Sequence, residues 1–152
     1  MMMRTVCAVA AIALGVTAAI AQQDPIAARK ALMKANGDHG KIGAAMIKGE
    51  TPFDLAKVHE IFATWEDASA KAPALFPENS IDQATADDPY SASPEIWHNL
   101  EDFKARLAKL GADAKAADAS VKDLDSFKAA FANIGKNDCG GCHEKYRLKK
   151  GG

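Results

Sequence analysis

Apolar residues recur every three or four positions along four stretches of the chain, and no stretch shows the two-residue alternation typical of a strand. Each stretch therefore predicts a helix that buries one face. Four such helices in about 130 residues favour an all-α, antiparallel bundle. The apolar stripes are Leu55, Val58, Ile61, Phe62 and Trp65 in the second stretch, Ile96, Trp97, Leu100, Phe103, Leu107 and Leu110 in the third, and Leu124, Phe127, Phe131 and Ile134 in the fourth.

Three of the expected helices begin with a cap residue followed by proline, an arrangement that suits the first turn of a helix. These start signals are Asp24-Pro25, Thr51-Pro52 and Ser93-Pro94. The first helix is expected to end at Lys48 and the second near Lys71, and the fourth to begin at Ser120 or Asp123. Residues 73–93 contain several prolines and predict a long connection, which is usually functional or loosely ordered.

The first residues have the pattern of a secretory signal peptide. Arg4 provides a positive start, residues 6–20 form an uncharged apolar run, and Ala19-Ile20-Ala21 is a small-x-small cleavage site. The run is short for a membrane span, which makes an uncleaved anchor the weaker alternative. We therefore expect residues 1–21 to be removed and residues 22–152 to form one domain. No later segment is apolar enough to cross a membrane, so stable membrane insertion is not expected.

Charge and cysteine content narrow the partners of the mature chain. Loss of Arg4 shifts the formal net charge from −1 to −2, which gives no reason to expect a nucleic-acid partner. Cys7 leaves with the leader, so Cys139 and Cys142 are the cysteines that remain. A disulfide across two intervening residues closes a very small loop and adds little stability. The pair therefore needs a chemical explanation more than a structural one.

The two cysteines belong to the sequence Cys-Gly-Gly-Cys-His at residues 139–143. In c-type haem attachment, thiols such as Cys139 and Cys142 add to the haem vinyl groups, and the adjacent His143 binds the iron. Two thioethers must reach one porphyrin edge while the next imidazole turns under the metal, and the two glycines keep side-chain bulk away from that edge. The motif therefore predicts one covalent haem.

Three other interpretations of the motif fit less well. A structural zinc site needs a further protein ligand from His39, His59 or His98, which lie on other predicted helices and are most simply partly exposed. A thioredoxin-like redox pair is found near a βαβ pattern, which this sequence lacks. A disulfide leaves His143 unexplained.

Several segments follow one another in an informative order. They are Arg29 with Met33, then Lys48-Gly49-Glu50-Thr51-Pro52-Phe53-Asp54, Leu75-Phe76-Pro77, Glu95-Ile96-Trp97, and the closing Cys-x-x-Cys-His-x-x-Tyr-Arg. With this order, and with the haem motif near the C-terminus, the mature chain resembles the cytochrome c′ family, the class II c-type cytochromes. The resemblance implies an up-down-up-down four-helix bundle that encloses the haem, and often a homodimer through the first two helices.

Met33 matches the family position that faces the distal side of the haem. In the cytochrome c-556 branch a methionine there binds the iron, whereas the cytochrome c′ branch often has a leucine, a phenylalanine or another non-ligand, and the iron stays five-coordinate. Leu32-Met33-Lys34 resembles the first branch, although some five-coordinate relatives also have methionine. Judged from the residues alone, a methionine on an amphipathic helix such as Met33 is more often a core residue than a ligand. Met46 projects from a largely different helix face and is expected in the core.

Two arginines are candidates for binding the haem propionates. Arg29 lies four residues before Met33, and Arg147 lies four residues after His143, so each is expected on the same helix face as a candidate iron ligand. A charge-assisted hydrogen bond to a propionate is one interpretation of each, and a solvated arginine is the other. Tyr146 is expected to pack near the haem edge.

These residues predict a periplasmic electron carrier and not an enzyme. With His143 and Met33 as axial ligands the iron would stay low-spin in both oxidation states, and redox proteins of the periplasm would be its partners. If Met33 does not bind, a five-coordinate haem could take up nitric oxide or carbon monoxide. A peroxidase is a weaker third interpretation, because no distal histidine–arginine pair can be placed from the sequence.

Overall fold

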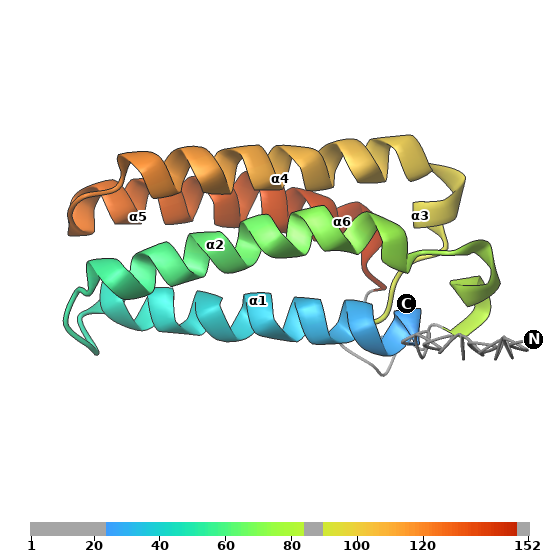
Figure 1. The fold of residues 1–152 in the computed structure, drawn as a ribbon, viewed down its shortest axis with the longest axis horizontal. Coiled ribbons are helices and arrows are strands. Elements are labelled where there is room, and N and C mark those ends of the chain that lie inside the picture. Colours follow the sequence, from blue (N-terminus) through green and yellow to red (C-terminus); the bar gives the residue numbers. More distant parts are fainter. Residues whose placement is uncertain (1–23, 84–89, 149–152) are drawn as a thin grey trace, which may run out of the picture.

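The computed structural model describes residues 24–83 and 90–148, and within them the chain forms an antiparallel helical bundle (Figure 1). The expected signal peptide, residues 1–21, lies outside the described residues. The bounds of the helices are α1 Pro25–Lys48, α2 Leu55–Lys71, η1 Ala72–Leu75, η2 Glu78–Gln83, α3 Glu95–His98, α4 Leu100–Ser120, α5 Leu124–Asn133, η3 Ile134–Gly140 and α6 Gly141–Tyr146. Four rods result, formed by α1, by α2, by α3 with α4, and by α5 with η3 and α6. The predicted all-α, up-down-up-down bundle is confirmed.

Aspartates cap three of the helices. The expected starts at Asp24-Pro25 and at Asp123 are confirmed, whereas the expected start at Thr51-Pro52 is wrong, because Asp54 caps α2 and the helix begins at Leu55. Asp24 and Asp54 accept hydrogen bonds from amides in the first turns of α1 and α2, and Asp123 forms a capping box with Ser126 at the start of α5. Each cap gives partners to amides that the helix itself leaves without one. Gly49 ends α1 in the left-handed conformation, with φ at 74°.

The third rod differs from the single helix expected after Ser93-Pro94. Helix α3 ends at His98, and Asn99 leaves the helical region (φ −132°, ψ 43°) before α4 begins. The Asn99 side-chain amide donates to the backbone and carboxylate oxygens of Glu95. Asparagine side chains compete in this way with helical hydrogen bonds, which gives the break a physical cause. The connection before it contains the short 3₁₀ helices η1 and η2, so it is partly ordered.

The fourth rod contains a π-helical segment, η3, which includes the first cysteine of the motif. A π-helix bonds residue i to residue i+5, so each of its turns takes in an extra residue. Ile134 and Asp138 are buried in this segment and Cys139 is half-buried, whereas Lys136 and Asn137 are exposed. The sequence predicts an ordinary helix here, because its apolar spacing carries no sign of a wider turn.

The chain leaves the helix after Tyr146. Arg147 is extended (φ −107°, ψ 136°) and pairs with Ala92 in an isolated β-bridge. Backbone hydrogen bonds of 2.9 and 3.1 Å flank the bridge and tie residues 146–148 to residues 91–93. The expectation that Arg147 lies on a continuing helix is therefore wrong, because these bonds take the place of helical ones.

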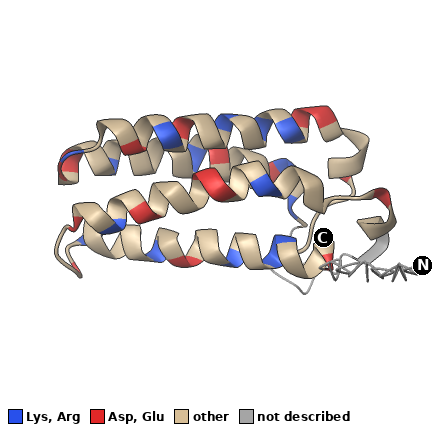
Figure 2. Cartoon of the chain, viewed as in Figure 1, with Lys and Arg blue, Asp and Glu red and all other residues tan. Residues whose placement is uncertain are grey.

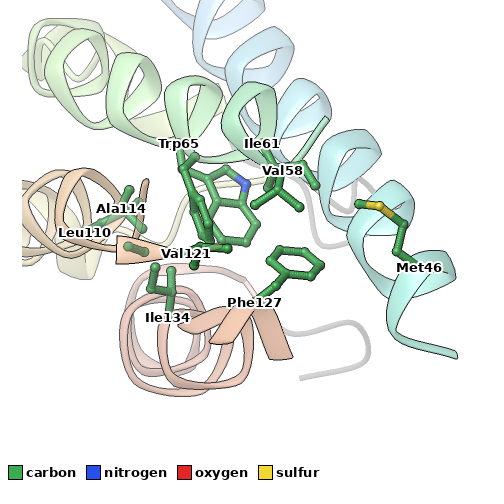
Figure 3. Packing of buried hydrophobic residues seen from close by; sticks show 11 residues of the cluster. Met46, Val58, Ile61, Trp65, Leu110, Ala114, Val121, Phe127 and Ile134 are labelled. Carbon is green, nitrogen blue, oxygen red and sulfur yellow. The ribbon is translucent and has the colours of Figure 1, made fainter. Parts of the chain in front are cut away.

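Two apolar clusters fill the bundle. The larger contains Met46, Val58, Ile61, Phe62, Trp65, Leu110, Ala114, Ala117, Val121, Phe127 and Ile134 (Figure 3). The smaller contains Ala72, Ala92, Ile96, Phe103, Leu107 and Tyr146. Trp65, Phe103 and Phe127 are buried as expected, while Trp97 and Phe131 pack partly buried against the clusters. No helix among the described residues is long and apolar enough to cross a membrane.

Candidate cofactor site

A cavity of about 390 Å³ lies inside the bundle. Residues of α1, α2, α4, η3 and α6 line it, together with the segment 90–92. Trp65 and Leu110 belong to the larger apolar cluster, Phe103 and Tyr146 to the smaller one, and all four face the cavity, which therefore lies between the clusters. Its volume falls in the range of small-molecule and cofactor sites.

The Cys-Gly-Gly-Cys-His motif lies in the wall of this cavity. Cys139 is near the end of η3, and Cys142 and His143 are in the first turn of α6. Both thiols are free and half-buried. Burial raises the pKa of Cys139 to about 11, with Asp138 and Cys142 adding to the shift, and burial also raises the pKa of Cys142. Both thiols are therefore neutral at pH 7, which argues against a thiolate redox pair.

The other histidines lie away from the motif. The Nδ1 atom of His59 is 2.6 Å from Asp118 Oδ1, and that pair is exposed. The His39 Nδ1 atom is 3.0 Å from the Ala35 carbonyl oxygen on its own helix. Within the part of the chain that the structure describes, no three His, Cys, Asp or Glu side chains are arranged to bind a metal ion. The zinc interpretation therefore has no support.

His143 is in the chemical form that a metal ligand requires. Burial lowers the pKa of this imidazole, and the positive charge of Arg147 lowers it further. The side chain is therefore neutral at pH 7, and a neutral imidazole can bind a metal through nitrogen.

Helix α1 forms another wall of the cavity, with residues spaced three or four positions apart. Arg29, Met33, Asn36, Gly37 and Gly40 all line it. Met33 and His143 therefore face the same cavity from different helices. Met46 does not line it, is 2% exposed and belongs to the larger cluster, so its expected core role is confirmed.

Three glycines leave open space along two walls. Gly37 and Gly40 on α1 and Gly135 on η3 all line the cavity, and a Cβ atom built on any of them meets nothing within 4 Å. By contrast, a Cβ atom on Gly43 would lie 2.5 Å from the Phe131 ring. A glycine inside a helix is less stable than alanine by about 1 kcal/mol. Packing against the Phe131 ring explains why residue 43 is a glycine. The open space beside Gly37, Gly40 and Gly135 fits a flat group held close to the backbone.

Arg29 is buried, so the solvated alternative for this residue is wrong. It is 3% exposed and donates hydrogen bonds to Ser80 Oγ (2.9 Å) and to the carbonyl oxygens of Leu75 and Ser80. Its guanidinium lies 5.0 Å from the centre of the Phe76 ring and 5.6 Å from that of Trp97. Burial lowers its pKa, an effect that Asp24 partly opposes. None of these hydrogen-bond partners is a carboxylate, and Nε is buried without a partner among the described residues. The site fits an added anionic group.

Arg147 also lines the cavity but is exposed. Its backbone is extended and its side chain is exposed, whereas Arg29 is helical and buried. Because the two arginines reach one cavity, an acidic ligand inside it would have a positive group at each of two places.

The polar residues of the cavity wall that the sequence analysis did not identify include Asn36, Arg106 and Asp138. Helical spacing could have identified Asn36, which follows Met33 by one turn. Asp138 directly precedes Cys139, but its burial depends on the π-helical turn, which the sequence does not reveal. Arg106 comes from α4, and only the tertiary fold brings it to the motif.

A charged network holds the motif helix against α4. Asp102 accepts hydrogen bonds from the Tyr146 hydroxyl, from Arg106 Nε (2.9 Å) and from Lys145 Nζ (3.2 Å). These three donors hold the pKa of Asp102 well below its usual range. Arg106 also donates from Nη1 to the carbonyl oxygen of Gly141 at 3.3 Å, which ties α4 to the backbone of the motif itself.

Known proteins share both the sequence and the fold. The cytochrome c′ family model matches residues 24–147. Over 150 residues the chain is 37% identical to the cytochrome c-556 of Rhodopseudomonas palustris, covering 99% of this chain and 100% of that protein. Over 139 residues it is 43% identical to the cytochrome c′ of the same organism, covering 91% of this chain and 92% of that protein.

Solved structures of the same two proteins superpose on this fold. The Rhodopseudomonas palustris cytochrome c′ gives a TM-score of 0.75 at 42% identity, covering 85% of this chain and 99% of that one. A structural model of oxidised cytochrome c556 from that organism gives a TM-score of 0.76 at 36% identity, covering 86% of this chain and 100% of that one. Since the cavity, its motif and these comparisons agree, the chain belongs to the cytochrome c′ family and carries haem c bound covalently through Cys139 and Cys142.

Proposed function

We propose that this protein is a periplasmic electron carrier in which His143 and Met33 are the axial ligands of the haem iron. The observation that carries the proposal is that both side chains line one cavity from different helices, while Met46 is packed in the core. The bound haem supplies a one-electron Fe(III)/Fe(II) couple. The two ligands stay bound in both oxidation states, so little of the site rearranges when an electron arrives.

The chain's own residues set the conditions for this transfer. The neutral His143 is ready to bind metal, the Met33 thioether favours the ferrous state, and the apolar lining excludes water. Arg29, whose Nε has no partner among the described residues, and the exposed Arg147 would hold the haem propionates. The protein transforms no substrate in this role, and its partners are redox proteins of the periplasm, to which the expected signal peptide sends it.

Gas binding is a second candidate function, favoured by the 43% identity to a cytochrome c′. In this case Met33 packs in the cavity wall without binding the iron. The open iron position then takes up nitric oxide or carbon monoxide. The two functions differ in the sixth ligand, which a spectrum reports directly.

The test compares two methionine variants with the native protein. Visible spectra of the oxidised and reduced holoprotein are recorded before and after addition of carbon monoxide. We expect sharp low-spin bands that ignore the gas in the native protein, and a high-spin spectrum that shifts with the gas in Met33→Leu. Met46→Leu is the matched control, and its spectrum should equal that of the native protein. A native spectrum that is broad and shifts with carbon monoxide rejects the His143/Met33 assignment in favour of the gas-binding function. A Met33→Leu variant that stays low-spin rejects Met33 as the ligand and shows that another group is the sixth ligand.

A further inference from the structure

A buried carboxylate lies in the wall of the haem cavity. Asp138 is 4% exposed, its side chain is 1% exposed, and it directly precedes Cys139 on η3. Its Oδ1 atom is 2.6 Å from Lys109 Nζ on α4. Its Oδ2 atom is buried and has no hydrogen-bond partner among the described residues. An ionised carboxylate in this position loses much of its hydration and regains only part of it from the protein.

Lys109 is shared between this carboxylate and a second one. Its Nζ atom also lies 2.5 Å from Asp113 Oδ2, one turn along α4. The Lys109 side chain is 56% exposed and that of Asp113 is 33% exposed. The hydrogen bonds to Asp113 and Asp138 raise the pKa of Lys109, and Lys109 lowers the pKa of Asp113. One ammonium group therefore faces two carboxylates, and the cluster keeps a net negative charge.

Burial decides which of the two carboxylates can act on the cavity. A charge near the surface is screened by water and salt, whereas a buried charge is screened much less. Asp113 lies toward solvent and Asp138 lies in the cavity wall, so a charge of the same size has unequal effects at the two positions. Ferric haem carries one more positive charge than ferrous haem, and a fixed anion nearby stabilises the ferric state.

We propose that Asp138 is a fixed negative charge that lowers the reduction potential of the haem, and that Lys109 is the positioning residue that holds this carboxylate in the cavity wall. The inference deepens the electron-carrier function and rests on it for its biological meaning, because the potential decides which donors and acceptors the carrier can serve. It does not depend on the identity of the sixth ligand. One electron is taken up, Fe(III) becomes Fe(II), and no proton or bond is exchanged at Asp138.

The experiment is a potentiometric titration of the holoprotein at pH 8 with small redox mediators, followed in the visible haem bands. Asp138→Asn removes the buried charge and keeps the shape of the side chain. At the midpoint potential of the native protein, we expect the ratio of reduced to oxidised Asp138→Asn to rise from one to between about three and ten. A tenfold ratio is about 59 mV for one electron. Asp113→Asn, the matched control on the same lysine, should change the ratio less than about twofold.

Lys109→Gln gives a result of opposite sign. It removes the positive charge that partly offsets Asp138, so the potential should fall below that of the native protein. General damage to the fold would move Asp138→Asn and Lys109→Gln in the same direction, and so would not reproduce this pattern. An Asp138→Asn potential that does not rise, or that shifts no more than Asp113→Asn, overturns the proposal. A Lys109→Gln potential that does not fall overturns the role of Lys109.

The same spectra separate this proposal from the proposed function. A high-spin native spectrum that responds to carbon monoxide rejects the Met33 ligation, whereas the potential shifts among the variants still report on Asp138. Low-spin spectra in all variants with equal potentials reject the role of Asp138 and leave the electron carrier standing.

Discussion

Arg29 occupies an unusual position for a charged side chain. Two aromatic rings and three oxygens of Leu75 and Ser80 surround it, and none of these oxygens carries a formal charge. Its burial depends on η1 and η2, which bring these oxygens over the start of α1. The helical spacing of Arg29 from Met33 predicts the face on which it lies, but it does not predict that a second segment covers it.

Replacement of the buried arginine should destabilise the holoprotein. Arg29→Gln removes a charged donor from several oxygens that remain buried, and we expect the free energy of unfolding to fall by about 2 to 3 kcal/mol. Arg147→Gln makes the same change at an exposed position and should cost less than about 1 kcal/mol. Guanidinium chloride unfolding, followed by circular dichroism, measures both. Equal losses for the two variants would contradict the distinction drawn between these arginines.

At the scale of the elements, the Asp102 carboxylate on α4 accepts the hydrogen bonds that connect this helix to α6. A carboxyl whose pKa is depressed in the folded state stabilises that state above its unfolded pKa of about 4, and this stability is lost as the pH falls toward the folded pKa. The donors Tyr146, Arg106 and Lys145 depress the pKa of Asp102, so the network acts at neutral pH and weakens in acid. At neutral pH the network therefore ties the haem motif to α4.

The Asp102→Asn variant tests this tie. Its melting temperature should lie below that of the native protein at pH 7. The difference in melting temperature should narrow at pH 3, because the carboxyl is then protonated in the unfolded chain while the folded chain still holds it charged. Melts followed by circular dichroism at the two pH values give the comparison. Asp125→Asn, an exposed change near the start of α5, serves as the control and should show a small difference throughout. If the difference in melting temperature between the native protein and Asp102→Asn stays constant from pH 7 to pH 3, the stabilisation by Asp102 is not ionic.

Local signals in the sequence predict the starts of the helices well and their interruptions poorly. Asp24 and Asp123 act over three residues, so the sequence alone reveals the caps that they form, whereas the cap of α2 is Asp54 and not the predicted Thr51. The break at Asn99 and the wide turn of η3 depend on contacts with other elements. The same contrast holds for the site. The Cys-Gly-Gly-Cys-His motif is local and could be found in the sequence, whereas the burial of Asp138 depends on other elements and could not be predicted.

At the scale of the whole molecule, charges of both signs are interspersed along every rod (Figure 2). Many form pairs within one helix, such as Lys34 with Asp38 and Lys71 with Asp67. Such pairs contribute little stability each, but they leave no broad field of one sign. Among the described residues, the exposed large apolar side chains are Ile42, Leu55 and Tyr90.

The expected homodimer through α1 and α2 can be tested at these positions. Ile42 lies on α1 and Leu55 begins α2, and their apolar surfaces would be covered in a dimer. We expect the native protein to sediment as a dimer at micromolar concentration and the double variant Ile42→Lys/Leu55→Lys to sediment as a monomer with an unchanged haem spectrum. Lys57→Ala, a control change on α2 near Leu55, should leave the dimer intact. A native protein that sediments as a monomer at these concentrations contradicts the expectation.

The glycines of the cavity wall have a consequence for the path of the electron. Gly37 and Gly135 line the cavity and are also exposed, so at these two places no side chain covers the main chain. The probability of electron tunnelling falls steeply with the thickness of the barrier. A redox partner that binds over Gly37 or Gly135 would bring its redox centre closer to the haem than a partner that binds where a side chain covers the backbone. In the proposed electron carrier, these glycine positions are therefore where we expect the electron to enter.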